Sequence, residues 1–260
     1  MSWIHDLLAG AGVGLVGGLT SGFMGTSPGG GLVIFSVLLL GAEQHVAQGT
    51  SLITQVPPTG LAGVRRYWQS GNRSPLQWIV WIGIGFLIGG GCGGYAAAAV
   101  PDSVLQWTYV IYLAALIALL ILRRDRKDGS SESGDQQQLP WLPLLLIGVL
   151  AGFSSGFMGI GGGLAITVGL AAGLRVPQHQ AQLVSLVFSV IPTNIPAAWI
   201  YWSKGLMVGW PAIIGILAGL WIGTDLGARA ANGVSKAVLR RVMIALISLM
   251  ALYMTHKALT

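Results

Sequence analysis

Apolar stretches alternate with short polar or glycine-rich breaks along almost the whole chain. In the first half they cover residues 7–23, 32–40, 44–67, 76–99 and 104–122, and in the second half residues 142–157, 164–174, 178–201, 210–230 and 238–253. Segments 76–99 and 104–122 are long enough as helices to cross about 30 Å of hydrocarbon, at a rise of about 1.5 Å per residue. This pattern predicts an all-α integral membrane protein.

A polar stretch separates the two halves. Residues 123–138 read RRDRKDGSSESGDQQQ, which is charged and rich in Ser and Gly. Such a composition is typical of a flexible linker. We therefore expect a first transmembrane repeat in residues 1–123, a linker in residues 124–140 and a second transmembrane repeat in residues 141–260.

The second half repeats the first in detail. The run Ser-Gly-Phe-Met-Gly at residues 21–25 returns at residues 155–159, an offset of 134. The same offset relates Gln44-His45 to Gln178-His179, Ser51-Leu52 to Ser185-Leu186, Pro58-Thr59 to Pro192-Thr193, and Gly85, Gly89 and Gly93 to Gly219, Gly223 and Gly227. The chain is a duplicated unit, as many secondary transporters are.

The distribution of Lys and Arg residues predicts how the halves are oriented. If each half crosses five times, one side holds 12 of the 14 basic residues and the other holds only Lys204 and Lys257. If residues 7–40 form one broken crossing, each half crosses four times, the repeats are parallel and the split is 9 against 5. The positive-inside rule favours five crossings and inverted repeats, with a cytoplasmic linker and both termini outside. A re-entrant hairpin would leave the loops on the same sides.

Two glycine clusters interrupt apolar sequence at equivalent places. Unwound backbone at membrane depth is tolerated only where it is buried in protein or lines a cavity. Each cluster also opens a short helix, whose unpaired N–H groups and dipole attract an anion. The alternative role of these glycines is a close helix crossing. The candidate substrate-binding positions here are Gly25, Ser27, Gly29, Gly30 and Gly31, with Gly159, Gly161, Gly162 and Gly163 in the second copy.

A polar stripe follows each short helix. Gln44, Gln48, Ser51 and Gln55 share one helical face, and Gln178, Gln182, Ser185 and Ser189 form the same stripe in the second half. Such a stripe avoids lipid, so it serves either as hydrogen bonds between helices or as the lining of a pathway. Two symmetric stripes beside glycine breaks favour the pathway, with Gln48, Ser51, Gln55, Gln182, Ser185 and Ser189 as candidate binding residues. Downstream, Pro58 and Pro192 are expected inside helices, freeing the carbonyls of Thr54 and Phe188.

The spaced glycines Gly85, Gly89 and Gly93 predict a different role. Small residues at every fourth position let membrane helices approach closely. We expect these glycines and their equivalents in the second half to serve packing and not substrate binding.

Few ionisable residues fall within the apolar segments. Asp225 lies four residues before Arg229, a spacing that predicts an ion pair on one helix face. His45 and His179 precede the two polar stripes, where they are either solvated caps or groups that carry a proton. Glu43 has Pro177 as its counterpart, so it is not repeated in the second half. The candidates for proton coupling are His45, His179, Glu43 and Asp225.

Composition excludes several classes of protein. Of the 260 residues 53% are hydrophobic and 8% are charged, against about a quarter charged in a soluble domain. The net charge of +6 falls at the ends of apolar segments, so the positive-inside rule explains it without nucleic acid. The single cysteine, Cys92, has no histidine near it in sequence, and no metal-binding spacing occurs. We expect no enzyme, metal or cofactor.

The doubled motif resembles the sulfite exporter TauE/SafE family. The resemblance rests on SGFMG followed by a glycine run, at residues 21–31 and 155–163, and it covers essentially the whole chain. It implies a transporter of small sulfur-containing anions such as sulfite, thiosulfate or sulfonates. The first copy departs from a plain glycine run because it reads Gly25-Thr26-Ser27-Pro28-Gly29. The alternatives are an anion channel made of the same parts, or a transporter of a neutral organosulfur compound.

Overall fold

Glycine and proline residues divide the chain into helices in a computed structural model that describes residues 3–24, 27–59, 64, 74–122, 139–232, 241, 245, 248, 249 and 251–256. Within these ranges the regular structure is helical. The helices are α1 (Trp3–Met24), α2 (Gly29–Leu40), α3 (Gln44–Thr54), α5 (Leu76–Ala97), α6 (Asp102–Leu122), α7 (Trp141–Met158), α8 (Gly163–Val168), a π-helix (Gly169–Gly173), α9 (Gln178–Val187), α10 (Ile195–Ser203) and α11 (Trp210–Asn232). Residues 251–256 are also helical. The expected linker, residues 124–140, lies mostly outside the described residues.

The ends of the helices follow from local chemistry. Proline precedes α5 and α7, where a fixed φ is compatible with a helix start and the missing N–H is not needed. Gly41 ends α2 at a φ of 62° and Gly159 ends α7 at a φ of 71°. Glycine adopts this left-handed conformation without the steric penalty of a Cβ atom.

The prediction that Pro58 and Pro192 lie inside helices is wrong. Helix α3 ends at Thr54 and α9 ends at Val187, so each proline falls in the non-helical segment that follows. The residue before a proline is disfavoured in helical conformation, and Pro57 and Pro58 are consecutive. The backbone therefore turns before the proline instead of continuing with one missing hydrogen bond.

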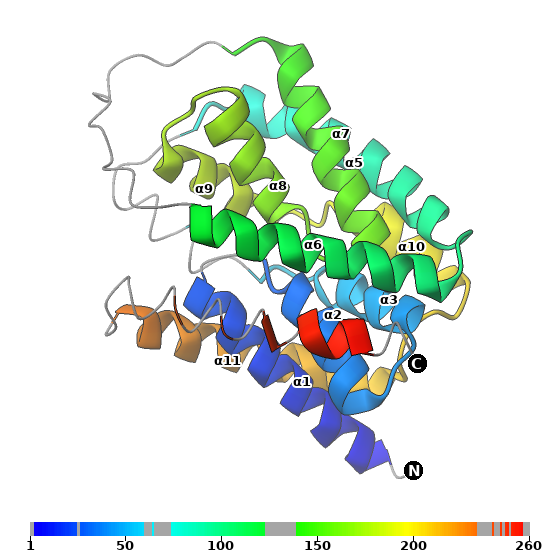
Figure 1. Cartoon of the computed structure of the whole chain (residues 1–260). Helices are drawn as coiled ribbons and strands as arrows, with labels where there is room; N and C mark the ends of the chain where they lie inside the picture. The colour runs from blue at the N-terminus through cyan, green and yellow to red at the C-terminus, as the bar shows by residue number, and fades with distance from the viewer. Residues whose placement is uncertain are drawn as a thin grey trace.

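Two helix pairs, α1 with α11 and α5 with α7, pack side by side at opposite ends of the molecule (Figure 1). Their backbones nearly touch, because a Cβ atom at Gly85 would overlap the carbonyl oxygen of Leu145 and one at Gly89 would overlap that of Val149. Gly219 and Gly223 of α11, the equivalents of Gly85 and Gly89, make the same contacts with α1. The predicted packing role of these glycines is confirmed.

The contacts of the two pairs correspond residue by residue. Gly14 lies against Ile216, and Gly148 lies against Ile82, which are the same positions shifted by 134 with the partners exchanged. The carbonyl of Leu220 next to Gly18 is likewise matched by that of Phe86 next to Gly152. Each of these contacts therefore occurs twice, with the two halves of the chain exchanged.

The outer faces of the long helices are apolar. Large exposed side chains include Leu87 and Ile88 on α5, Leu150 on α7 and Trp221 on α11. Among the described residues three helices are long and apolar enough to cross a membrane, namely Leu76–Ala97, Trp141–Met158 and Trp210–Gly227. The molecule is thus an all-helical membrane protein, and the five-crossing layout stays a prediction.

Candidate functional site

The two glycine breaks meet in the middle of the molecule. Ser27, in the first break, donates a hydrogen bond from Oγ to Oε1 of Gln55 over 2.7 Å. Gly161, at the equivalent position of the second break, has a φ of 67°. A Cβ atom there would overlap both Ser27 Oγ and Gln55 Oε1. Only glycine fits at position 161, because both the backbone conformation and the space require it.

Ser51 joins the two breaks. Its Oγ lies 3.2 Å from the carbonyl oxygen of Gly29 and 2.7 Å from that of Gly159, so one hydroxyl serves a residue in each break. The amide nitrogen of Gln55 in turn donates to Ser51 Oγ over 3.0 Å. In the second half, Ser185 Oγ donates to the carbonyl of Gly163 over 2.8 Å, which reproduces the bond between Ser51 and Gly29.

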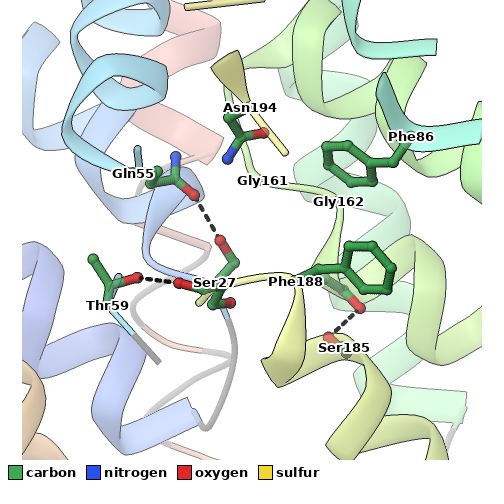
Figure 2. Close-up of a pocket in the computed structure, with 11 residues that line it drawn as sticks. Ser27, Gln55, Thr59, Phe86, Gly161, Gly162, Ser185, Phe188 and Asn194 are labelled. Atoms are coloured by element: carbon green, nitrogen blue, oxygen red, sulfur yellow. Dashed lines mark hydrogen bonds between the residues drawn. The ribbon is translucent and has the colours of Figure 1, made fainter. Parts of the chain in front are cut away.

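A cavity with a volume of about 10 Å³, roughly the space of one water molecule, lies where the breaks meet (Figure 2). Phe86 and Phe188 stack with ring centroids 5.9 Å apart on one side of it. Ser27, Gln55 and Thr59 lie on the other side (Figure 2). The full lining is Ser27, Gln55, Thr59, Phe86, Gly161, Gly162, Gly163, Ser185, Phe188, Ser189 and Asn194.

The polar groups of the cavity are neutral. Among the described residues that line it, none carries a charge, and hydroxyl and amide groups supply its hydrogen-bond donors. Ser155 Oγ donates to Oδ1 of Asn194 over 3.0 Å, and the side-chain nitrogen of Asn194 points toward the space between Gln55 and Gly161 (Figure 2). The first residues of α8 form one wall. A small polar solute with several acceptor oxygens suits this lining.

Seven of the predicted binding residues line the cavity. They are Ser27, Gln55, Gly161, Gly162, Gly163, Ser185 and Ser189. The breaks and the C-terminal residues of the two stripes thus line one cavity, and their role in substrate binding stays a prediction.

The other predicted binding residues that the structure describes lie behind this lining. A Cβ atom at Gly29 would overlap Ile160, and one at Gly31 would lie 2.8 Å from Thr20 Oγ1, so these glycines allow close packing. Gly30 accepts a hydrogen bond from Tyr109, and Gly159 contacts Gln48. The expectation that both helix starts face the site therefore holds for α8 alone. Gly25 lies outside the described residues, and Gln182 is half-buried.

The stripe on α3 is buried along its whole length, as predicted, and its residues divide between two roles. Gln48 is fully buried and accepts a hydrogen bond from the Tyr201 hydroxyl over 3.0 Å, which ties α3 to α10. Ser51 holds the breaks together, and Gln55 reaches the cavity. Of the two alternatives left open by the sequence, helix contact is observed for Gln48 and Ser51, and pathway lining stays a prediction for Gln55.

Four lining residues were missed, namely Thr59, Phe86, Phe188 and Asn194. Thr59 follows a proline that is repeated at position 192, so its sequence signal was visible. The position equivalent to Asn194 in the first half is Gly60, and the position equivalent to Phe86 in the second half is Leu220. Neither residue is repeated, so the comparison of the two halves could not identify them.

The candidate proton-coupling groups lie away from the cavity. His45 contacts the carboxylate of Asp102 through Nδ1, and its Nε2 lies 2.9 Å from the carbonyl oxygen of Ala97. It is ten residues before Gln55, which is about 15 Å along a helix. Asp225 forms the predicted ion pair with Arg229 over 2.6 Å on an exposed surface. Glu43 is exposed before α3, and the side chain of His179 lies outside the described atoms.

This combination of lipid-exposed apolar helices and a polar cavity between two broken helices is typical of membrane transporters. Comparison with known proteins gives the family. The family model "Sulfite exporter TauE/SafE" matches residues 9–254, so the chain belongs to this family of membrane transporters.

Individual relatives support the class. The chain is 26% identical over 235 residues to "Probable membrane transporter protein YdhB" of Bacillus subtilis (strain 168), covering 86% of this chain and 89% of the relative. It is also 26% identical over 254 residues to a "Probable membrane transporter protein" of Xylella fastidiosa (strain 9a5c), covering 93% of both chains.

Proposed function

We propose that the protein is a secondary transporter that moves a small sulfur-containing anion, such as sulfite, thiosulfate or a sulfonate, by alternating access. Two inverted repeats of five membrane segments each would rock against one another around a site between the glycine breaks. The membrane is the cell membrane, with the linker 124–140 in the cytoplasm and both termini outside.

The observation that carries this proposal is the position of the cavity. It lies where Ser27 and Gly161, equivalent residues of the two halves, contact each other, and both halves contribute to its lining. A site on the boundary between two repeats is the place where relative movement of the repeats changes access most directly.

The chemistry of the lining suits an anion that accepts several hydrogen bonds. The side-chain amide of Asn194 and the hydroxyl of Ser189 are hydrogen-bond donors in the lining. The hydroxyls of Ser185 and Thr59 donate to the carbonyls of Gly163 and Ser189 and would have to turn toward a bound anion. Donors without a fixed positive charge suit a ligand that must also be released, since conduction and transport both require moderate affinity. The stacked Phe86 and Phe188 offer an apolar wall for the carbon part of a sulfonate.

Ligand-induced stabilisation tests the proposed site. Purified protein would be titrated with sulfite, sulfate, thiosulfate and short sulfonates while its thermal unfolding is followed. A ligand that binds only the folded state stabilises it by RT ln(1 + [L]/Kd), about 2.7 kcal/mol at a hundredfold excess over Kd. We expect stabilisation by at least one of these anions, and its loss in Ser185→Ala.

The matched control is Ser203→Ala, which removes the same hydroxyl from an exposed position at the end of α10. It should keep the full ligand-induced shift. Stabilisation that survives Ser185→Ala and Gln55→Ala together would place binding elsewhere. No shift with any anion would contradict the proposed substrate class.

A further inference from the structure

The cavity is unequally shared between the two halves of the chain. Seven of its eleven lining residues belong to the second half, among them Ser185 and Phe188. Their equivalents in the first half are Ser51 and Thr54, and both are 0% exposed. Ser185 and Phe188 are also buried, at 8% and 5% exposed, but they line the cavity, whereas their equivalents in the first half do not.

Thr59 and Thr193 show the same inequality in their hydrogen bonds. Thr59 crosses to the second half, where its backbone N–H donates to the carbonyl of Ser189 over 3.0 Å and its Oγ1 lies 3.4 Å from the same oxygen. Thr193 instead donates its N–H to Ile191 over 2.7 Å. Its Oγ1 is buried and has no hydrogen-bond partner. A buried hydroxyl without a partner is unfavourable, so a rearrangement that gave Thr193 an acceptor would remove this cost.

Several other contacts of the two halves are symmetric, which makes this inequality informative. The hydrogen bond from Ser51 to Gly29 is repeated by the bond from Ser185 to Gly163. The crossing of α1 with α11 repeats that of α5 with α7. Two halves with the same internal contacts can exchange their positions with little change in local structure.

We propose that a second, mirrored cavity opens in the other state of the transporter, lined by Gly29, Ser51, Thr54, Gln55 and Thr193. In that state the bond between Thr59 and Ser189 is released, and Thr193 donates to the carbonyl of Gln55, the residue equivalent to Ser189. Ser27 and Gly161 remain at the centre of both cavities. The inference rests on the proposed function and names the residues that bind the anion on the second side of the membrane.

Labelling of cysteines from each side of the membrane tests this inference. The sole cysteine, Cys92, is exposed and is first replaced by Ala. Thr54→Cys and Phe188→Cys then form a pair, because they are equivalent positions in the two halves that line opposite cavities in the proposal. A membrane-impermeant maleimide is applied to right-side-out and to inside-out vesicles.

We expect Phe188→Cys to react from one face and Thr54→Cys to react from the opposite face. Adding a transported anion to one side should raise one rate and lower the other. Reaction of both cysteines from the same face would overturn the proposal. So would a Thr54→Cys protein that still transports but never reacts. Thr193→Cys with Thr59→Cys gives a second matched pair if Thr54→Cys does not fold.

A flux measurement on the same vesicles keeps this inference apart from the proposed function. Opposite-face labelling in a protein that moves none of the sulfur anions would support the exchange of cavities and remove the proposed substrate. Anion flux together with same-face labelling would keep the substrate and remove the mirrored cavity.

Discussion

Ser27 and Gly161, which hold the same position in the two halves of the chain, contact each other at the junction of the two broken helices. A Cβ atom at Gly161 would overlap the Ser27 hydroxyl, so the larger residue in one half requires the smallest residue in the other. Ser27 stands where the second glycine run has Gly161, and the absence of a side chain at Gly161 makes room for it. This contact marks the centre of the cavity.

Replacing Gly161 by alanine is expected to abolish transport and to lower stability. Alanine at a φ of 67° costs about 1–2 kcal/mol in backbone strain, and its Cβ also overlaps Ser27 and Gln55. Gly41→Ala is the control, because Gly41 has a φ of 62° and open space around it. Alanine there introduces the backbone strain without a steric overlap. Anion flux and thermal unfolding of both variants would be compared. Equal losses in the two variants would show that crowding at the junction is unimportant, whereas Ser27→Gly should partly rescue Gly161→Ala.

The close helix pairs give a second prediction. Gly89→Ala is expected to lower the thermal midpoint markedly, because its Cβ would overlap the backbone of Val149 on α7. Gly12→Ala, on α1, meets nothing within 4 Å and is expected to be neutral or to stabilise by up to about 1 kcal/mol through helix propensity. Unfolding in detergent measures both. If Gly89→Ala were as stable as Gly12→Ala, the helices would not be packed as the structure shows.

Ser51 offers a test of the link between the breaks. Ser51→Ala removes the hydroxyl shared by the carbonyls of Gly29 and Gly159 and leaves them short of a donor, which should reduce the free energy of unfolding by about 1–3 kcal/mol. Ser154→Ala is the control, since the Ser154 hydroxyl bonds only within its own helix. Chemical denaturation would show the difference. A Ser51→Ala protein no weaker than the control would remove Ser51 as the link.

His45 provides a test of proton coupling. Glutamine cannot gain or lose a proton near neutral pH, so His45→Gln should lose the acceleration of uptake by an imposed pH gradient and keep exchange of labelled for unlabelled anion. Asp102→Asn, which alters the partner of His45, should have the same effect. His5→Gln is matched, because His5 also lies beside an aspartate but is exposed near the start of the chain. Unchanged gradient-driven uptake in His45→Gln would exclude His45 as the coupling group.

Much of this arrangement was visible in the sequence because repetition exposed it. The glycine runs, the polar stripes and the spaced glycines recur at one offset, and each turned out to bend the chain, to face the interior or to bring helices together. The ion pair of Asp225 with Arg229 followed from helical spacing alone.

The rest depends on contacts between distant segments. Phe86 reaches the cavity from α5 because α5 packs on α7, and no local pattern distinguishes it from other apolar residues of that helix. Asn194 escaped because its counterpart is Gly60 and repetition could not point to it. The different hydrogen bonds of Thr59 and Thr193 belong to one conformation of the protein. The two Pro-Thr pairs are identical in sequence, so the sequence could not predict this difference.

Anion counterflow in proteoliposomes tests the central claim most directly. Vesicles loaded with unlabelled sulfite or thiosulfate would be diluted into a trace of the same labelled anion, with Gly161→Ala as the inactive comparison and Gly41→Ala as the active one. A carrier with its site at the junction of the breaks predicts transient accumulation of label that saturates with substrate and is absent in Gly161→Ala. Flux that never saturates and shows no counterflow, or no flux of any of these anions, would contradict it.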